Sequence, residues 1–325
     1  MTQFLAFILI AAHLSVPVND QQPIVDPPIS KAAVESKPRT SRSFLTAGGS
    51  EIEVDIKLEN SALQTDDVLT SVRRATQAVT TYYGRFPVRH ARVSVIQSDD
   101  DDQSIHGTTW GDVDGFQGVS RMRLGRAVSK ADLETDWTMT HELVHLAMSS
   151  LSDKHHWLEE GLATYVEPIA RAQDDQLPAA KVWESMISGM VEGEPQKGDH
   201  GLDKTHTWGR TYWGGALFCL VADIEIRRAT ANRRGLQDAL RAIVAEGATI
   251  DTEWPLARVL SVGDKATGTK VLTNLYNSWK ETPVPVNLNQ LWLQLGVQAN
   301  RHGIVFDSNA PLADLRRSIT ERPNR

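Results

Sequence analysis

The sequence of 325 residues contains a single cysteine, Cys219, so no disulfide bond can form within the chain. It also has no basic stripe: acidic residues outnumber basic ones by 41 to 34, and the formal net charge is −7. This balance argues against a nucleic-acid partner. Beyond residue 16, no apolar run is long enough to cross a membrane. Stability must therefore come from a packed core, for which the chain is long enough.

The only long apolar run is Phe4 to Val16, which is too short to span a bilayer as a helix and has the length of a signal-peptide core. No lysine or arginine precedes it, and no clear cleavage site follows it. We expect residues 1–18 to direct export to the periplasm, the cell envelope or the medium, with an uncleaved membrane anchor as the alternative. Residues 19–46, rich in proline and polar side chains, predict a linker. A folded domain of residues 47–325 follows.

Hydrophobic periodicity divides this domain into two halves. In the first half, alternating apolar residues predict strands at 51–58 and 92–97, and helical spacing predicts a helix over 65–83 between them. Residues 107–118 are rich in glycine and aspartate and predict a connection with turns, whereas 117–124 can form a further strand. Helical patterns dominate the second half, at 179–191, 212–229, 235–246, 254–261, 268–280, 288–296 and 310–320.

The segment His141-Glu142-Leu143-Val144-His145 lies within a stretch of helical apolar spacing that begins at Trp137. Residues four apart share one face of a helix, so His141 and His145 can bind one metal ion. Glu142 beside them can reach a metal-bound water. Ser129 or Asp132 is the expected cap of this helix. The alternative is a chance match in an ordinary packed helix.

Two histidines leave a catalytic zinc ion one protein ligand short. Glu160 can supply it, because fourteen residues separate it from His145 and it opens a new helical pattern. Another known zinc-helix continuation has a glycine three residues after the second histidine and a third histidine three residues later. Met148 and Leu151 occupy those two positions, so this continuation is absent.

Four further histidines follow along the chain: His155, His156, His200 and His206. We interpret them as loop residues rather than metal ligands, because none has a partner at helical spacing. The loop that carries the last two is expected to bring them, together with Arg210, toward the cleft.

The run Trp157-Leu158-Glu159-Glu160-Gly161-Leu162-Ala163-Thr164-Tyr165-Val166-Glu167 resembles the W-L-N-E-G-F-A-S-Y-V-E segment of aminopeptidase N-type gluzincins, of the peptidase MA clan. The resemblance implies that Glu160 is the third ligand of one zinc ion per chain. A later run that starts at Tyr212 is similar to the Y-E-K-G-F-A-L-L-F-Y-L-E run of the family, which implies that the Tyr212 hydroxyl stabilises an oxyanion. Glu167, in register with the family's glutamate, is expected to accept the second N–H of a ligating histidine.

The resemblance also implies a fold and a reaction. The fold is thermolysin-like α+β, with a mixed β-sheet and helices in residues 47–150, a mainly helical lobe in residues 151–325, and the active site between them. The reaction is zinc-dependent hydrolysis of a peptide or protein substrate, with Glu142 as the general base. In this family a strand just before the zinc helix holds extended substrate, and Val119 to Leu124 can take that place or be an ordinary strand of the sheet.

Two departures separate the sequence from aminopeptidases. The loop between the two zinc-binding helices is shorter than in the family, and the G-x-M-E-N strand, whose glutamate holds the substrate's amino terminus, is absent. We therefore expect an endopeptidase, unless Glu134, Asp112 or Asp114 supplies the missing anchor. Two other classes stay open: a zinc hydrolase of a non-peptide substrate, and a catalytically silent binding protein on a peptidase fold. Glu142 and Tyr212 argue against the second class, because neither is needed merely to bind metal.

Overall fold

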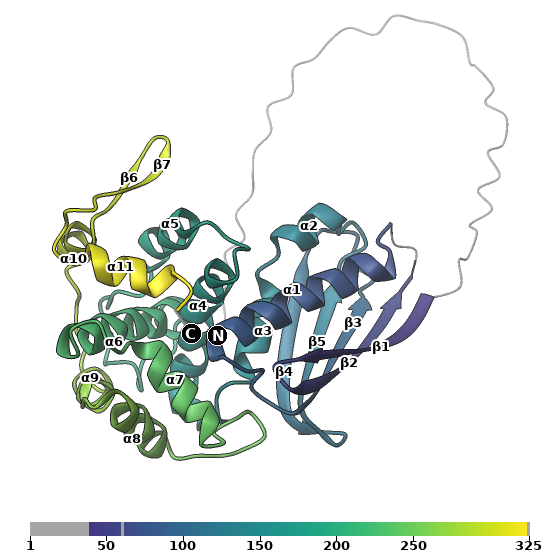
Figure 1. Cartoon of the computed structure of the whole chain (residues 1–325), viewed down its shortest axis with the longest axis horizontal. Coiled ribbons are helices and arrows are strands. Elements are labelled where there is room, and N and C mark those ends of the chain that lie inside the picture. Colours follow the sequence, from purple (N-terminus) through teal and green to yellow (C-terminus); the bar gives the residue numbers. More distant parts are fainter. Residues whose placement is uncertain (1–38, 60–61, 324–325) are drawn as a thin grey trace, which may run out of the picture. The chain divides into compact units, whose positions relative to one another are not determined.

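Five strands form one mixed sheet in the computed structural model, which describes residues 39–59 and 62–323. The strands are β1 (Arg39–Ala47), β2 (Ser50–Leu58), β3 (His90–Gln97), β4 (Ile105–Val113) and β5 (Phe116–Leu124). Their order is β1-β2-β3-β5-β4. The central strands β2, β3 and β5 are parallel neighbours, whereas β1 and β4 pair antiparallel at the two edges. β4 is the edge that faces the helical half of the chain (Figure 1).

Helix α1 (Thr65–Tyr83) connects β2 to β3 and crosses one face of the sheet (Figure 1). Its buried side, which includes Val68, Val72 and Val79, packs on the apolar positions of the strands, as the periodicity predicted. The helix ends at Gly84, whose φ of 75° is left-handed and suits a residue without a Cβ. The strands predicted at 51–58 and 92–97 and the helix predicted at 65–83 are thus confirmed.

Two short helices stand where the sequence predicted one longer helix. Ser129 and Asp132 form the capping box of α2 (Lys130–Thr135), one element earlier than expected. The next helix, α3 (Thr138–His145), is capped by Asp136, whose carboxylate accepts the backbone N–H groups of Thr138 and Met139 at 3.0 Å each. α3 packs on β4 and β5, on the face of the sheet that α1 also covers.

The second half of the chain is mainly helical, as predicted. Its helices are α4 (His156–Gln173), α5 (Ala179–Gly189), α6 (Gly215–Ala229), α7 (Leu236–Ala245), α8 (Leu256–Thr267), α9 (Val271–Trp279), α10 (Leu288–Leu295) and α11 (Ala313–Thr320). A small antiparallel hairpin of β6 (Val297–Asn300) and β7 (Gly303–Phe306) projects beside α10 (Figure 1). The α+β class expected from the sequence is therefore present, with the sheet first and the helices after it.

Two sequence predictions about the five-stranded sheet are wrong. Residues 39–46, expected within the linker, form most of β1, which pairs with β2 along its whole length. Residues 107–118, expected as a connection, form β4, a tight turn and the start of β5. As a result β5 lies inside the sheet between β3 and β4, so of the two alternatives for residues 119–124 it is an ordinary strand of the sheet. The hairpin of β4 and β5 places β4, rather than β5, at the edge of the sheet.

The expected signal or anchor segment of residues 1–18, and the linker as far as residue 38, lie outside the described residues. Within residues 39–59 and 62–323, no helix is long and apolar enough to cross a membrane.

Candidate metal centre

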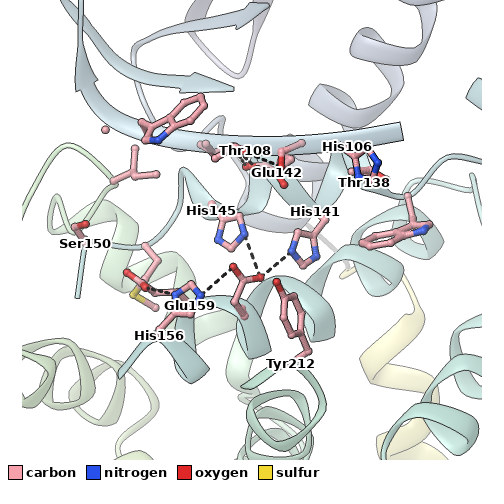
Figure 2. Close-up of a pocket in the computed structure, with 18 of the residues that line it drawn as sticks. His106, Thr108, Thr138, His141, Glu142, His145, Ser150, His156, Glu159 and Tyr212 are labelled. Atoms are coloured by element: carbon pink, nitrogen blue, oxygen red, sulfur yellow. Dashed lines mark hydrogen bonds and ion pairs between the residues drawn. The ribbon is translucent and has the colours of Figure 1, made fainter. Parts of the chain in front are cut away.

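Helices α3 and α4 bring three side chains that could hold a metal ion to one point. His141 and His145 project from the same face of α3 (Figure 2). Glu160 reaches them from the second turn of α4. The Glu160 Oε2 atom lies 3.2 Å from His141 Nε2 and 3.7 Å from His145 Nε2. The three ligand atoms all lie within 4.8 Å of one another. The residues that the sequence picked out as one ligand set therefore converge in space.

A very close crossing of α4 and α6 lies beside these residues. A Cβ atom on Gly161 would lie 2.3 Å from the Gly215 Cα atom, and one on Gly215 would lie 2.0 Å from the Trp157 carbonyl oxygen. No side chain fits there, so both positions need glycine. Glu160 precedes one of these glycines and Tyr212 lies three residues before the other. The crossing therefore sets Glu160 and Tyr212 side by side.

The donor set fits a zinc ion. Two imidazoles and one carboxylate are a ligand set of catalytic zinc sites, which keep a fourth position open. Ligand atoms about 2.1 Å from a tetrahedral ion are about 3.4 Å apart. The separations of 3.2 and 3.7 Å lie on either side of that value. Little rearrangement would be needed for these atoms to share one ion.

The protonation states also suit metal binding. Burial, together with the neighbouring His141, lowers the pKa of His145 to about 4, so its imidazole is neutral near pH 7. Burial opposes ionisation of Glu160, but the hydrogen bond with His141 and the charges of the surrounding histidines outweigh it and lower the pKa of this carboxyl. A neutral imidazole and an ionised carboxylate are the forms that coordinate metal.

His156 and Glu159 form a second layer around Glu160. His156 Nε2 lies 3.6 Å from Glu160 Oε1, and its Nδ1 lies 3.2 Å from Glu159 Oε2. Glu159 Oε1 accepts the backbone N–H of Leu151 at 2.8 Å, so this carboxylate is turned away from the ligand set. His156, interpreted from the sequence as a loop residue, opens α4 and lines the cleft.

The Glu142 side chain projects from α3 toward the edge strand β4. The Thr109 hydroxyl donates a hydrogen bond to Glu142 Oε2 at 2.7 Å, which fixes the carboxylate in the cleft. A Cβ atom on Gly107 would lie 2.2 Å from Glu142 Cγ, so β4 can approach this side chain only through a glycine. Burial raises the pKa of Glu142, although the hydrogen bond from Thr109 opposes the shift. A raised pKa brings a carboxylate nearer to the range useful for a general base.

Tyr212 sits in a π-helical turn, Arg210–Gly214, directly before α6. Such turns are frequent at functional sites. Its ring stacks near His141, with centroids 6.4 Å apart, and the side chain points toward the metal-binding histidines (Figure 2). Burial and the charges of Glu160 and Glu142 raise the pKa of Tyr212 to about 12. The hydroxyl therefore keeps its proton at neutral pH and can donate it in a hydrogen bond.

A cleft of about 860 Å³ surrounds these residues. One wall is β4 from Ile105 to Gly111, whose far side is paired with β5 and whose near side faces the cleft. The other wall is formed by α3, the start of α4 and Tyr212. None of the three acids considered as amino-terminal anchors lines the cleft: Glu134 is in α2, and Asp112 and Asp114 lie at the β4–β5 turn.

The histidines and arginine expected to line the cleft lie elsewhere. His200 and His206 are not among the lining residues, so this expectation is wrong. Arg210 is buried, and its guanidinium lies 2.7 Å from the Asp199 carboxylate.

Glu167 is buried in α4 beside Arg171, which donates a hydrogen bond to it at 2.8 Å. Burial raises the pKa of Glu167, while the charges of Arg171 and His141 oppose the shift. The carboxylate is thus paired with Arg171, and its role as the partner of His141 stays a prediction.

No protein-family model matches this sequence, and no curated protein matches it either. Solved structures are similar. An aminopeptidase N family protein from Idiomarina loihiensis superimposes with a TM-score of 0.61 at 11% identity, over 80% of this chain and 49% of that one. An M1 zinc metallopeptidase from Deinococcus radiodurans gives a TM-score of 0.49 at 15% identity, over 78% of this chain and 53% of that one.

A two-domain M1 zinc metallopeptidase variant bound to L-tryptophan also gives a TM-score of 0.49, at 13% identity, over 78% of this chain and 53% of that one. This chain thus spans about half the length of these proteins. At such low identity, the superposition on the Idiomarina protein shows a shared fold.

Proposed function

We propose that this chain is a zinc-dependent peptidase that cuts within polypeptide chains. One observation carries the proposal: His141, His145 and Glu160 converge in a cleft into which Glu142 and Tyr212 also project. A purely structural zinc site closes all positions with protein ligands, whereas this one has three. The fold shared with an aminopeptidase N family protein supports the same activity class.

Each side chain then has a defined task. A zinc ion held by His141, His145 and Glu160 supplies Lewis acidity and a water of lowered pKa. Glu142 takes the proton of the attacking water and delivers it to the leaving amine. Thr109 holds the Glu142 carboxylate in place through their 2.7 Å hydrogen bond. The protonated Tyr212 hydroxyl donates to the oxygen that gains negative charge as the carbonyl becomes tetrahedral.

The substrate pairs with the free side of β4. An extended peptide can add to an exposed sheet edge through backbone hydrogen bonds, and β4 offers such an edge directly above Glu142. β4 carries no acidic residue between Ile105 and Gly111. The carboxylates that line the cleft are Glu142, Glu159 and Glu160, and the first and last of these are assigned to catalysis and metal binding.

Purified protein is expected to contain one zinc ion per chain, and the content is expected to fall in His145→Ala and Glu160→Gln. Each change removes one of the three ligands that the described part of the chain supplies. Glu159→Gln is the matched control, because it alters the neighbouring carboxylate, which faces Leu151 and His156 instead. Elemental analysis after dialysis measures the content. A zinc content near zero in the wild type, or equal loss in Glu159→Gln and Glu160→Gln, contradicts the ligand assignment.

A peptide with an acetylated amino terminus is expected to be cut at least as fast as the same peptide with a free one. No unassigned, unpaired carboxylate among the lining residues is available to hold an ammonium group, and an uncompensated charge in a desolvated cleft is costly. Mass spectrometry of the products from the matched pair gives both the rates and the cut positions. Stepwise removal of single residues from the free peptide alone would identify an aminopeptidase instead.

A further inference from the structure

The three exposed tryptophans of the protein lie on elements that form or adjoin the cleft. Of its nine tryptophans, only Trp110, Trp137 and Trp208 are exposed, by 41%, 54% and 63%. Trp110 and Trp137 line the cleft, and Trp208 stacks on Tyr212 with ring centroids 5.9 Å apart. An indole presents a large apolar surface, and several exposed together mark an interaction site.

Two of these rings continue the aromatic surface of the site. Trp137 stands edge-on to His141 with centroids 5.5 Å apart, and His141 in turn stacks with Tyr212 at 6.4 Å. Trp208 covers the Tyr212 ring at an interplanar angle of 28°. The rings of Trp137, His141, Tyr212 and Trp208 therefore form one row, with the two exposed tryptophans at its ends.

Trp110 stands farther along the edge strand. Gly107, opposite Glu142, and Trp110 are three residues apart, or roughly 10 Å in an extended strand. Trp137 precedes Thr138, which lies at the His106 end of β4, so Trp110 lies toward the other end (Figure 2). A peptide paired with β4 turns every second side chain to the sheet face that carries Trp110, where cross-strand neighbours touch.

Charge in the cleft does not favour a charged substrate side chain. Among residues 39–59 and 62–323, no lysine or arginine lines it. Glu142 and Glu160 belong to the metal centre, and Glu159 is engaged by His156 and the Leu151 N–H group. The exposed large apolar side chains of the lining are thus Trp137 and Trp110, and the Arg121 guanidinium of β5 lies 5.4 Å from the Trp110 ring centroid.

We propose that Trp110, Trp137 and Trp208 form an aromatic rim that selects extended polypeptide segments with bulky apolar or aromatic side chains on both sides of the bond to be cut. The proposal rests on the peptidase activity proposed above and names its substrate class. Trp137 and Trp208 contact side chains at one end of the cleft, and Trp110 contacts a side chain paired with β4 toward the other end.

The first test uses two internally quenched peptides of equal length, one with phenylalanine and leucine at the central positions and one with serine and threonine there. Wild type is expected to favour the apolar peptide. Trp110→Ala, Trp137→Ala and Trp208→Ala are each expected to raise KM for it about threefold to tenfold, with a smaller change in kcat. Leu293→Ala is the control, because Leu293 is 58% exposed in α10, away from the cleft, and is expected to leave both constants unchanged.

Equal cleavage of both peptides by wild type, or equal loss on both peptides in the tryptophan variants, overturns the proposal while leaving the peptidase activity established.

A second measurement does not need activity. Zinc-loaded Glu142→Gln is titrated with the fluorescently labelled apolar peptide, and anisotropy reports binding with and without Trp137→Ala. Tryptophan-dependent binding without any cleavage by the wild type would support the rim and refute the peptidase proposal. Tryptophan-dependent binding to phosphatidylcholine vesicles, with none to the peptide, would overturn the rim in favour of a membrane surface.

Discussion

Glu142→Gln is expected to lower kcat by about 10²–10⁴ and to leave zinc bound. Glutamine has the same shape, so it can keep its place between Gly107 and Thr109, but its amide cannot take a proton from water. The side chain is not a metal ligand, because the converging ligand atoms are those of His141, His145 and Glu160. Single-turnover hydrolysis of a quenched peptide and elemental zinc analysis on the same sample measure the two effects.

Glu134→Gln is the matched control for this change. Glu134 is an exposed glutamate in α2 and does not line the cleft, so its replacement is expected to change neither rate nor zinc content. If Glu142→Gln lost zinc as completely as His145→Ala does, Glu142 would be a ligand and the assignment of roles would be wrong. If it kept full activity, another group would have to take the proton.

The residues that the sequence placed correctly are those whose geometry is local. His141 and His145 are four residues apart in one helix, so their common direction follows from helical spacing alone. Glu160 is close in sequence and opens the next helix, which limits how far it can lie from them. The glycine after Glu160 and the glycine three residues after Tyr212 carry a long-range signal, because both are required where α4 and α6 touch.

The edge strand could not be predicted in the same way, because it depends on contacts between distant segments. Residues 107–118 contain four glycines, which the sequence presents as turn residues. The structure places only Gly115 in the turn; a Cβ on Gly107 would meet Glu142, one on Gly111 would meet the Ile250 carbonyl, and one on Gly118 would meet Leu146. These glycines permit close packing inside strands.

The same limit explains why Thr109 and His156 were missed as site residues. Thr109 contributes one hydroxyl across a gap of 33 residues, and a threonine in a strand gives no signal of its own. The spacing of His156 from other histidines gives no sign of metal binding, so the sequence favours a loop residue. In the structure its side chain instead contacts Glu160, which lies four residues later on the same helix. The strand order β3-β5-β4, which brings Thr109 to Glu142, follows only once the β4–β5 hairpin is known.

Tyr212→Phe is expected to lower kcat by about 10²–10³ with little change in KM or zinc content. The hydroxyl is the only group removed, and the ring can still stack between His141 and Trp208. Because the pKa of Tyr212 is raised to about 12, the hydroxyl stays protonated throughout the neutral range. Its loss should therefore lower the rate by a constant factor from pH 6 to pH 9, which a pH series of kcat measures.

Tyr276→Phe removes the same atom from a tyrosine outside the cleft. The Tyr276 hydroxyl donates to Asp203 at 2.8 Å, so its loss is expected to lower the free energy of unfolding by about 1–2 kcal/mol and to leave kcat unchanged. The pair separates a role in catalysis from a role in folding. A Tyr212→Phe variant with wild-type kcat would mean that the developing negative charge is stabilised without this hydroxyl, and the π-helical turn that carries Tyr212 would then have only the structural task of joining the loop before it to α6.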